Sequence, residues 1–472
     1  MVRSTRISRR AALTARGTSD LFRRLRLRVV VLAISFALIP FAPAQDQLNG
    51  GINSGVTTIR IAVADFKPLA ADSQSAAFKQ TFDATLYADL ATSGIFDIVS
   101  KSLMPPGTPG APSDVQLQAY SNAPASAAFV AFGSIGLVGG RLVANGFLFD
   151  AKNLQYPQVL AKQYSNDPTD DNARQMAHQF ADEIILRLGG GIPGIAETKI
   201  YYVKSSGSGI NVSKEIWMMD YDGANQHAVT HLGTISISPR VSPDNSRLAF
   251  SSLGRNGFQI RMFSLLLGRA VNFPEIGGTN ISPAWSPNGN EIAYSSSRTG
   301  DPEIWISDAG GNLPRQITHI RGPDSSPTYN PRTGAQIAWI SGRTGLPQLY
   351  IMNTDGTAIQ QMTDGGYVSS PSWSPNGQLI AFAWNRKYGP GAPGGEDIYI
   401  MDVASKRWVQ LTHDSGGCDF PSWSPDGRHI VYASSPDGKP EHTRIFTMLA
   451  GDGSQRRALT GPGADMPNWS WK

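Results

Sequence analysis

Cysteine is nearly absent from this 472-residue chain, which contains one, Cys418. A single thiol cannot form an internal disulfide, so the fold depends on packing. We expect Cys418 to lie in a loop before a strand and to have no function, because a nucleophilic thiol needs a basic partner and an electropositive setting. The chain also lacks a Gly-x-Ser-x-Gly elbow and any His/Asp/Glu cluster at metal-ligand spacing. The sequence therefore predicts no catalytic residue, metal or cofactor.

A basic surface is absent once the front of the chain is set aside. Residues 1–44 hold nine arginines and one acid, which leaves 32 basic and 36 acidic residues in the remainder. Nucleic-acid binding needs a patch of lysine and arginine. The formal charge of +4 therefore does not indicate a nucleic-acid partner.

A hydrophobic run long enough to span a membrane with confidence is also missing. The apolar stretch Val29–Ile39 follows the arginines, and Ala42-Pro43-Ala44 comes soon after it. A basic region, a short apolar run and an A-x-A site are typical of a secretory signal peptide. We expect cleavage between Ala44 and Gln45; the alternative is an uncleaved anchor. The mature chain is then exported, peripheral to membranes and without a transmembrane span.

A short phrase recurs through the second half of the chain. It is Trp-Ser-Pro-Asn-Gly at 285–289 and 373–377, and Trp-Ser-Pro-Asp-Gly at 423–427, with looser copies near Ser242 and Asn330. A truncated copy contains Ser470, and the copies are spaced by 44, 44, 44, 50 and 46 residues. A period near 44 composed of short strands is typical of propeller blades.

Each repeat predicts four antiparallel strands with alternating apolar residues. The first repeat lacks an opening Trp-Ser-Pro strand, while the chain finishes with an unpaired one, Met466–Ser470. We therefore predict a six-bladed propeller whose C-terminal strand completes the first blade and closes the ring, which removes an exposed sheet edge. The regular spacing of Trp285, Trp373, Trp423 and Trp469 predicts packing between blades rather than ligand contact.

Residues 56–190 lack the repeat and read as an α/β domain. We expect strands over 58–66, 95–99, 127–135 and 142–149, and helices over 76–90 and 172–188. The full division is a signal peptide over 1–44, a flexible N-terminus over 45–55, the α/β domain over 56–190, a linker over 191–197 and the propeller over 198–472.

Three features of the chain invite functional readings. Gly133-Ser134-Ile135-Gly136 imitates a phosphate loop but lacks a following Lys-Ser/Thr, so hairpin glycine is favoured. His178 lies beside an apolar helical stripe and reads as a packing or capping residue. Asp220-Tyr221-Asp222-Gly223 opens like a calcium loop but lacks the later ligands, and it falls where each blade has a hairpin.

Several segments together resemble the TolB family of periplasmic propeller proteins in the Tol-Pal envelope system. They are Asp89–Phe96 (Asp-Leu-x-x-Ser-Gly-x-Phe), Ala177–Asp182 (Ala-His-x-x-x-Asp), the linker Gly191–Ala196 and the strand Thr198–Val203. The resemblance implies a monomeric, non-enzymatic periplasmic scaffold. It would bind the peptidoglycan-associated lipoprotein Pal through the propeller and the inner-membrane protein TolA through the mature N-terminus, supporting outer-membrane constriction at division and outer-membrane integrity. The stretch Gln45–Gly55 is rich in Gly and Asn and departs from the family's β-prone TolA segment.

Blade geometry narrows the surface that binds a partner. Connections from strand two to strand three, and from strand four to the next blade, lie on one end of the ring, where we expect polar groups of several blades to converge. The 50-residue step comes from an insertion over 385–396 in a two-to-three loop. The candidate partner-binding residues at this end are His231, Thr279, Asn280, His319, Asp324, Asp364, Tyr367, His413 and Asp419.

Two other functions remain open at this stage. Six-bladed propellers also occur in metal-dependent lactonases and in serine peptidases, so a metal-dependent hydrolase is one alternative. A glycan or peptidoglycan binder is the other, given a central channel and many aromatic residues.

Overall fold

The computed structural model describes residues 58–207, 212–389, 395–413 and 416–471. The predicted signal peptide, its cleavage site at Ala44 and Gln45 and the stretch Gln45–Gly55 lie outside the described residues, as does part of the insertion over 385–396. Among the described helices, none has the length and apolar character that crossing a bilayer requires.

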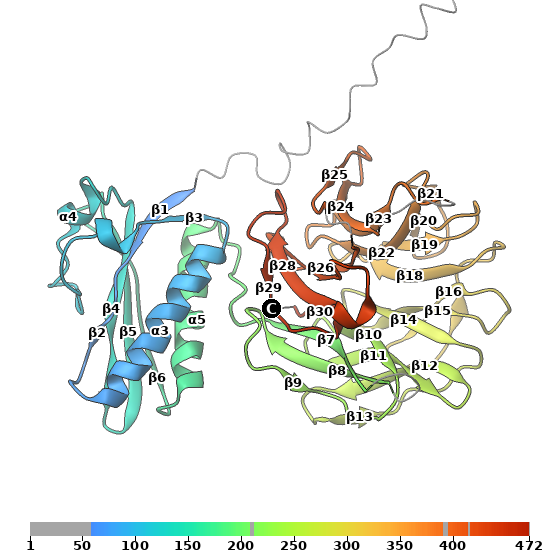
Figure 1. Ribbon diagram of the computed structural model, residues 1–472, viewed down its shortest axis with the longest axis horizontal. Helices are drawn as coiled ribbons and strands as arrows, with labels where there is room; N and C mark the ends of the chain where they lie inside the picture. Colours follow the sequence, from blue (N-terminus) through green and yellow to red (C-terminus); the bar gives the residue numbers. More distant parts are fainter. Residues whose placement is uncertain (1–57, 208–211, 390–394, 414–415, 472) are drawn as a thin grey trace, which may run out of the picture. The chain divides into compact units, whose positions relative to one another are not determined.

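The front of the described chain is a mixed sheet covered by two long helices (Figure 1). The order across the sheet is β3-β1-β4-β5-β6, with β2 also paired to β4. The first strands pair in parallel and β4, β5 and β6 antiparallel. The elements are β1 (Ile59–Val63), β2 (Lys67–Pro68), α3 (Ser73–Thr92), β3 (Phe96–Ile98), α4 (Leu117–Ser121), β4 (Phe129–Val138), β5 (Arg141–Asp150), β6 (Gln158–Asn166) and α5 (Asp170–Leu188).

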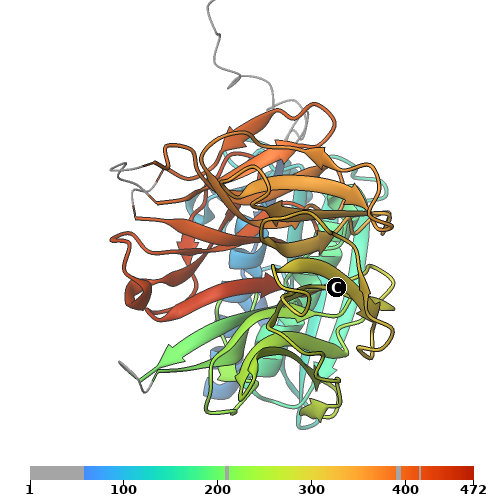
Figure 2. The same ribbon diagram turned by 90° about the vertical axis from the view of Figure 1, so that its right-hand side faces the viewer.

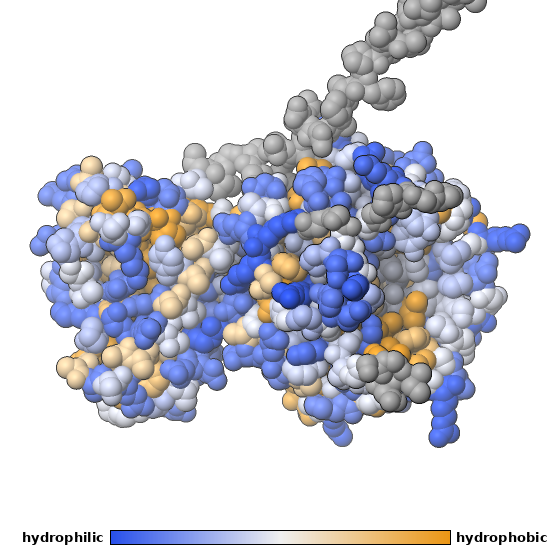
Figure 3. All heavy atoms as spheres, viewed as in Figure 1, coloured by the Kyte–Doolittle hydropathy of each residue, from blue (hydrophilic) through white to orange (hydrophobic). Residues whose placement is uncertain are grey.

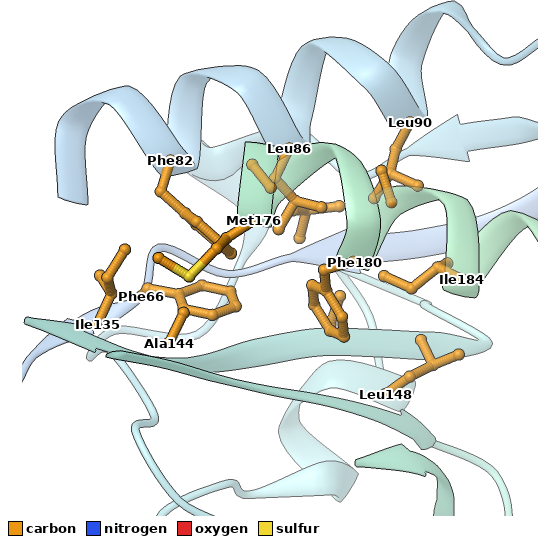
Figure 4. Close-up of a cluster of buried hydrophobic side chains, with 14 of the residues drawn as sticks. Phe66, Phe82, Leu86, Leu90, Ile135, Ala144, Leu148, Met176, Phe180 and Ile184 are labelled. Carbon is orange, nitrogen blue, oxygen red and sulfur yellow. The ribbon is translucent and has the colours of Figure 1, made fainter. Parts of the chain in front are cut away.

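Local chemistry fixes both long helices. Asp72 caps α3 by accepting the N–H of Ser75 at 2.7 Å, and Thr169 caps α5 by accepting the N–H of Asn172 at 3.2 Å. Figure 4 shows Phe82, Leu86 and Leu90 of α3 together with Met176, Phe180 and Ile184 of α5 above the sheet. This apolar layer is the core of the α/β region.

The two predicted helices and the four predicted strands are present with small shifts of their bounds. Strand β6 was not foreseen, because polar residues lie on both of its faces. The glycines of this region, predicted from sequence to form a hairpin turn, have two different roles. Gly139 and Gly140 form the turn with positive φ, whereas Gly133 lies inside β4, where a Cβ would come within 2.0 Å of the Asn145 carbonyl oxygen. Close packing of β4 on β5, and not a turn, therefore requires Gly133.

The rest of the chain forms six four-stranded sheets arranged as the blades of a propeller, as predicted (Figures 1 and 2). Blade 1 is β30 (Ala464–Trp469), β7 (Lys199–Ser206), β8 (Ser213–Asp220) and β9 (His227–Ala228). Blade 2 is β10 (Ser236–Val241), β11 (Arg247–Gly254), β12 (Gly257–Ser264) and β13 (Arg269–Val271). Blade 3 is β14 (Asn280–Trp285), β15 (Glu291–Ser296), β16 (Glu303–Asp308) and β17 (Arg315–Gln316).

The remaining blades follow the same plan. Blade 4 is β18 (Asp324–Tyr329), β19 (Gln336–Ser341), β20 (Gln348–Asn353) and β21 (Gln360–Gln361). Blade 5 is β22 (Tyr367–Trp373), β23 (Leu379–Asn385), β24 (Asp397–Asp402) and β25 (Trp408–Gln410). Blade 6 is β26 (Cys418–Trp423), β27 (His429–Ser434), β28 (Arg444–Leu449) and β29 (Arg457–Ala458).

The C-terminal strand closes the ring, because β30 pairs antiparallel with β7 at the start of the propeller. The indole N–H of Trp469 donates to the Thr198 hydroxyl at 2.8 Å. The Ser470 hydroxyl accepts the backbone N–H of Lys199 at 2.9 Å. Residues separated by more than 260 positions in the sequence are thus joined in one blade.

The repeated Trp-Ser-Pro phrase forms the tight connection between strands one and two of a blade. In blade 3 the Ser286 hydroxyl donates to the Asn288 side chain at 2.7 Å and accepts the N–H of Glu291 at 2.9 Å. Gly289 then takes a φ of 70°, which is the left-handed region that glycine adopts without strain. Ser374 and Ser424 make the equivalent bonds in blades 5 and 6.

The tryptophans of this phrase join neighbouring blades, which confirms the predicted packing between blades. The Trp285 indole donates to the Arg240 carbonyl of blade 2 at 3.1 Å, and the Trp423 indole to the Ser372 carbonyl of blade 5 at 3.1 Å. All four tryptophans are buried.

The expected setting of Cys418 is wrong. The residue is the first of strand β26 and is fully buried, with its thiol 3.4 Å from the Ser434 hydroxyl. In the strand register of blade 6 it stands opposite Ser434.

Candidate partner-binding face

The channel of the propeller has two ends, which we name by their connections. The turn end carries the connections between strands one and two and between strands three and four. The loop end carries the connections between strands two and three and from strand four to the next blade. The nine candidate residues lie at the loop end.

A buried threonine anchors the loop at this end in several blades. Thr318 accepts the N–H of Ile304 at 2.9 Å and donates to Glu303 at 2.5 Å. Thr363 accepts the N–H of Leu349 and donates to Gln348, both at 2.9 Å. Thr230 and Thr412 repeat the arrangement in blades 1 and 5. The threonine therefore holds each loop, and the residue after it is presented outward.

Those outward residues are His231, His319, Asp364 and His413, and each is exposed. Three imidazoles and a carboxylate on separate blades offer donors and acceptors to a partner surface. Residues of this kind on loops of a rigid scaffold are common in binding sites.

Asn280 and Asp324 differ from these residues because both are fully buried. The Asn280 amide donates to Gln259 at 3.0 Å, and Asp324 accepts from Arg343 at 3.2 Å. They shape the loops beside them. Thr279, which is partly buried, donates its backbone N–H to the Ser297 hydroxyl at 2.9 Å.

Tyr367 and Asp419 are partly buried and lie in an acidic group with Glu396 and Asp465. Burial, together with the charges of Glu396 and Asp465, raises the pKa of Asp419 to about 7. Burial also raises the pKa of Asp465. The Tyr367 ring lies 5.3 Å from the ring of Tyr388, which belongs to the inserted loop. Inner strands of blades 5, 6 and 1 thus contribute to one polar region.

Sequence reasoning missed Asp465, Glu396 and Tyr388. A signal for the first was available, because Asp419 and Asp465 both stand two residues before the proline of their inner strand. The blade repeat makes these two positions equivalent, so choosing Asp419 as a candidate predicts a similar place for Asp465.

At the turn end, residues of blades 1 and 6 contact the α/β region. The carboxylate of Asp89 on α3 accepts a hydrogen bond from the Tyr221 hydroxyl of blade 1 and lies 2.7 Å from His178 Nδ1 on α5. Burial raises the pKa of Asp89. Burial opposes protonation of His178, but the hydrogen bond and charge of Asp89 outweigh it and raise the pKa of His178.

The blade 1 hairpin that opens like a calcium loop belongs to this junction. Arg174 on α5 donates to Asp222 at 3.0 Å and to Asp220 at 3.4 Å, and Lys199 donates to Asp220 at 2.6 Å. Basic side chains therefore satisfy both acids. Among the residues that the structure describes, no group of three or more His, Cys, Asp or Glu side chains is arranged to hold a metal ion.

Blade 6 completes the junction from the turn end. Arg428 donates to the Gly189 carbonyl at 3.0 Å, and His429 Nε2 lies 2.7 Å from the Thr92 carbonyl. The segments around Asp89 and His178 that carry the family resemblance thus meet each other and the propeller.

Comparisons with known proteins agree with this architecture. The model of the TolB beta propeller domain matches residues 187–390 and 365–472, and the model of the TolB amino-terminal domain matches residues 52–155. The Tol-Pal system protein TolB of Gluconobacter oxydans is 32% identical over 370 residues, which cover 78% of this chain and 79% of that protein. A TolB homolog of Chlorobium luteolum is 31% identical over 58% of this chain and 60% of its own.

A solved structure shares the whole fold. The crystal structure of TolB from Acinetobacter baumannii covers 88% of this chain and 97% of its own, with a TM-score of 0.72 and 22% identity. The sequence comparisons go further than the fold, because they match both the front region and the propeller. On these matches, the chain belongs to the TolB family.

Proposed function

We propose that this protein is a periplasmic scaffold of the Tol-Pal system that binds a Pal-like peptidoglycan-associated lipoprotein through the loop end of its propeller. In this role it supports outer-membrane invagination at cell division and keeps the outer membrane intact. The observation that carries the proposal is the loop end itself, where exposed polar residues of separate blades surround the channel in a member of the TolB family.

The arrangement of the two ends supports the choice of surface. At the turn end, blades 1 and 6 contact the α/β region. At the loop end, His231, His319, Asp364 and His413 are exposed. A protein interface needs roughly 800 Å² from each partner, so a partner would contact the loops of several blades.

Export to the periplasm rests on the arginine-rich front, the apolar run and Ala42-Pro43-Ala44. A second contact, with a TolA-like inner-membrane protein, is assigned to the mature N-terminus over Gln45–Gly55. That assignment rests on the family alone, and the glycine and asparagine content of the segment makes it the weaker of the two.

The proposed role is binding and includes no catalytic step. A metal-dependent hydrolase would reveal itself through a stoichiometric, tightly held metal ion together with turnover of a substrate. A glycan binder would retain peptidoglycan fragments without a protein partner.

The experiment is an affinity purification of the tagged mature protein from an envelope extract, followed by mass spectrometry and a repeat with purified components. We expect one Pal-like lipoprotein to be recovered and to bind directly. A variant carrying His319→Ala, Asp364→Ala and His413→Ala should lose it, whereas Asn290→Ala with Gln378→Ala, two exposed positions at the turn end, should retain it. Recovery of glycan alone, or equal binding by both variants, would refute the proposal.

A further inference from the structure

Five of the six blades carry an aromatic pair at one register position of strands two and three. Directly opposite residues in an antiparallel sheet have adjacent side chains. The pairs are Tyr202 and Trp217, Tyr294 and Trp305, Trp339 and Tyr350, Phe382 and Tyr399, and Tyr432 and Phe446. Ring centroids of the last three pairs are 5.5, 6.1 and 5.9 Å apart.

These pairs face the preceding blade. Trp305 of blade 3, for example, is buried against Met262 of blade 2, and Tyr350 of blade 4 against Ile304 of blade 3. The second aromatic ring therefore fills the space between consecutive blades.

Blade 2 departs from this pattern, since Phe250 is opposite Arg261. Phe250 packs toward Tyr201 and Ile216 of blade 1 as the pattern requires. Arg261 is not an aromatic substitute. Its guanidinium donates to Glu275 at 3.0 Å, and its side chain is 42% exposed.

A cavity of about 470 Å³ lies at this position. Phe250, Arg261, Phe263 and Phe273 of blade 2 line it, and His231 and Leu232 come from the loop after blade 1. Its volume falls within the range of about 300–1,000 Å³ for small-molecule sites, and its walls are mostly apolar and aromatic, as such sites are. Leu232 and Leu253 at the cavity are 49% and 38% exposed, and Figure 3 shows apolar surface on the propeller in the area where Figure 1 labels β10 and β11.

In blades 1, 3 and 4 a basic side chain lies beside the aromatic ring of strand three. Lys204 Nζ lies 4.2 Å from the centroid of the Trp217 ring. The guanidinium carbon of Arg298 lies 4.6 Å from the centroid of the Trp305 ring. The guanidinium carbon of Arg343 lies 4.9 Å from the centroid of the Tyr350 ring. A cation within about 6 Å of an aromatic face is attracted to it. Blade 2 has the cation, Arg261, and an open cavity, but it has no aromatic ring at this position of strand three.

We infer that this cavity between blades 1 and 2 binds a small planar aromatic acid. Its ring fills the space that the strand-three aromatic residue fills in the other blades and lies beside the Arg261 guanidinium, tilted so that its acidic group meets the N–H edge. Because a guanidinium has five N–H groups and Glu275 takes one of them, the acidic substituent accepts a hydrogen bond from the same side chain. The site shares His231 with the loop end, but it does not rest on the proposed lipoprotein binding.

The test uses 8-anilinonaphthalene-1-sulfonate, an aromatic acid whose planar naphthalene ring carries the sulfonate and whose fluorescence rises on binding, titrated into the full mature chain. Wild type should show one saturable site. Arg261→Trp restores the aromatic pair and fills the cavity, so it should weaken binding at least tenfold. Arg321→Trp adds an indole at an exposed position of another blade and should bind as wild type does.

Arg261→Ala leaves the cavity open and removes the cation, and it should weaken binding about two- to fivefold. This variant also decides the matter if Arg261→Trp fails to fold, as judged by circular dichroism. Absence of a saturable site in wild type, or unchanged affinity in both Arg261 variants, would overturn the inference.

Discussion

The two ends of the propeller channel are made by the same inner strands but differ in kind. At the turn end, Trp-Ser-Pro phrases recur from blade to blade, and a cavity of about 100 Å³ is lined by residues such as Pro287, Pro375 and Pro425 of equivalent turns. At the loop end, the residue five positions before the last residue of the inner strand is Ser236, Asn280, Asp324, Val368, Cys418 or Ala464 in turn.

This difference distinguishes positions that maintain the fold from positions that can contact a partner. A position that repeats in every blade answers a need common to all blades, such as a tight turn or a contact with the next blade. A position that varies is not constrained in that way and is free to suit a partner. Substitutions at the turn end should therefore change stability, and those at the loop end should change binding.

The largest effect is expected from removing the closing strand. Deletion of Asn468–Lys472 eliminates two of the four residue pairs that join β30 to β7, together with buried Trp469. We expect the melting temperature to fall by more than about 10 °C, because 1 kcal/mol corresponds to about 2–4 °C in a domain of 150–250 residues and the deletion removes several kcal/mol of packing and pairing. Calorimetry measures this, and a truncated protein that melts with the wild type would show that the ring does not need its last strand.

Truncating one repeated tryptophan is the next largest change. Trp423→Ala opens a cavity between blades 5 and 6 and removes the bond to the Ser372 carbonyl, so it should lower the free energy of unfolding by about 3–5 kcal/mol. His413→Ala, at the exposed loop end, should change it by less than about 0.5 kcal/mol. Urea titration of both variants compares them, and equal losses would remove the distinction between the two ends.

The junction at the turn end offers a smaller test. Tyr221→Phe keeps the ring but deprives the buried Asp89 carboxylate of a donor, which should cost about 1–3 kcal/mol. Tyr156→Phe, at a tyrosine that is 75% exposed, is the matched control and should cost almost nothing. Chemical denaturation gives both values. If Tyr221→Phe left the free energy of unfolding unchanged, the hydrogen bond to His178 alone would be enough for the Asp89 carboxylate.

A stability effect that depends on pH is expected at the loop end. Because burial raises the pKa of Asp419 to about 7, the folded protein keeps this proton over a range in which the unfolded chain has released it. The free energy of unfolding should therefore fall as pH rises from about 4 to about 7 and then level off. Asp419→Asn should remove about 1–3 kcal/mol of that fall. Unfolding at pH 4.5 and pH 8 tests this, and identical pH profiles of the two proteins would contradict it.

Much of the fold could be predicted because a blade repeat imposes a period on the sequence. The closure by Trp469 followed from counting strands of each type. Strand β6 was missed because polar residues lie on both of its faces, such as Lys162, which pairs with Glu183 of α5, and Gln163. The junction of Asp89, His178 and Tyr221 could not be found, since these residues are far apart in the chain and only tertiary packing brings them together.

The candidate site was foreseen unevenly. The exposure of His231, His319, Asp364 and His413 follows from loops that a threonine holds. The burial of Asn280 and Asp324 does not follow from sequence, because polar residues at a strand start read as solvated. The cavity beside Arg261 needed the register of strands two and three, which pattern alone does not give.

The affinity of the purified Pal-like lipoprotein for matched variants of the two ends tests the central claim most directly. Isothermal titration calorimetry should show binding at least tenfold weaker for His319→Ala, Asp364→Ala and His413→Ala combined, with an unchanged melting temperature. Asn290→Ala with Gln378→Ala, at the turn end, should bind as wild type does. The opposite ranking, with the turn-end variant impaired and the loop-end variant unaffected, would contradict the account.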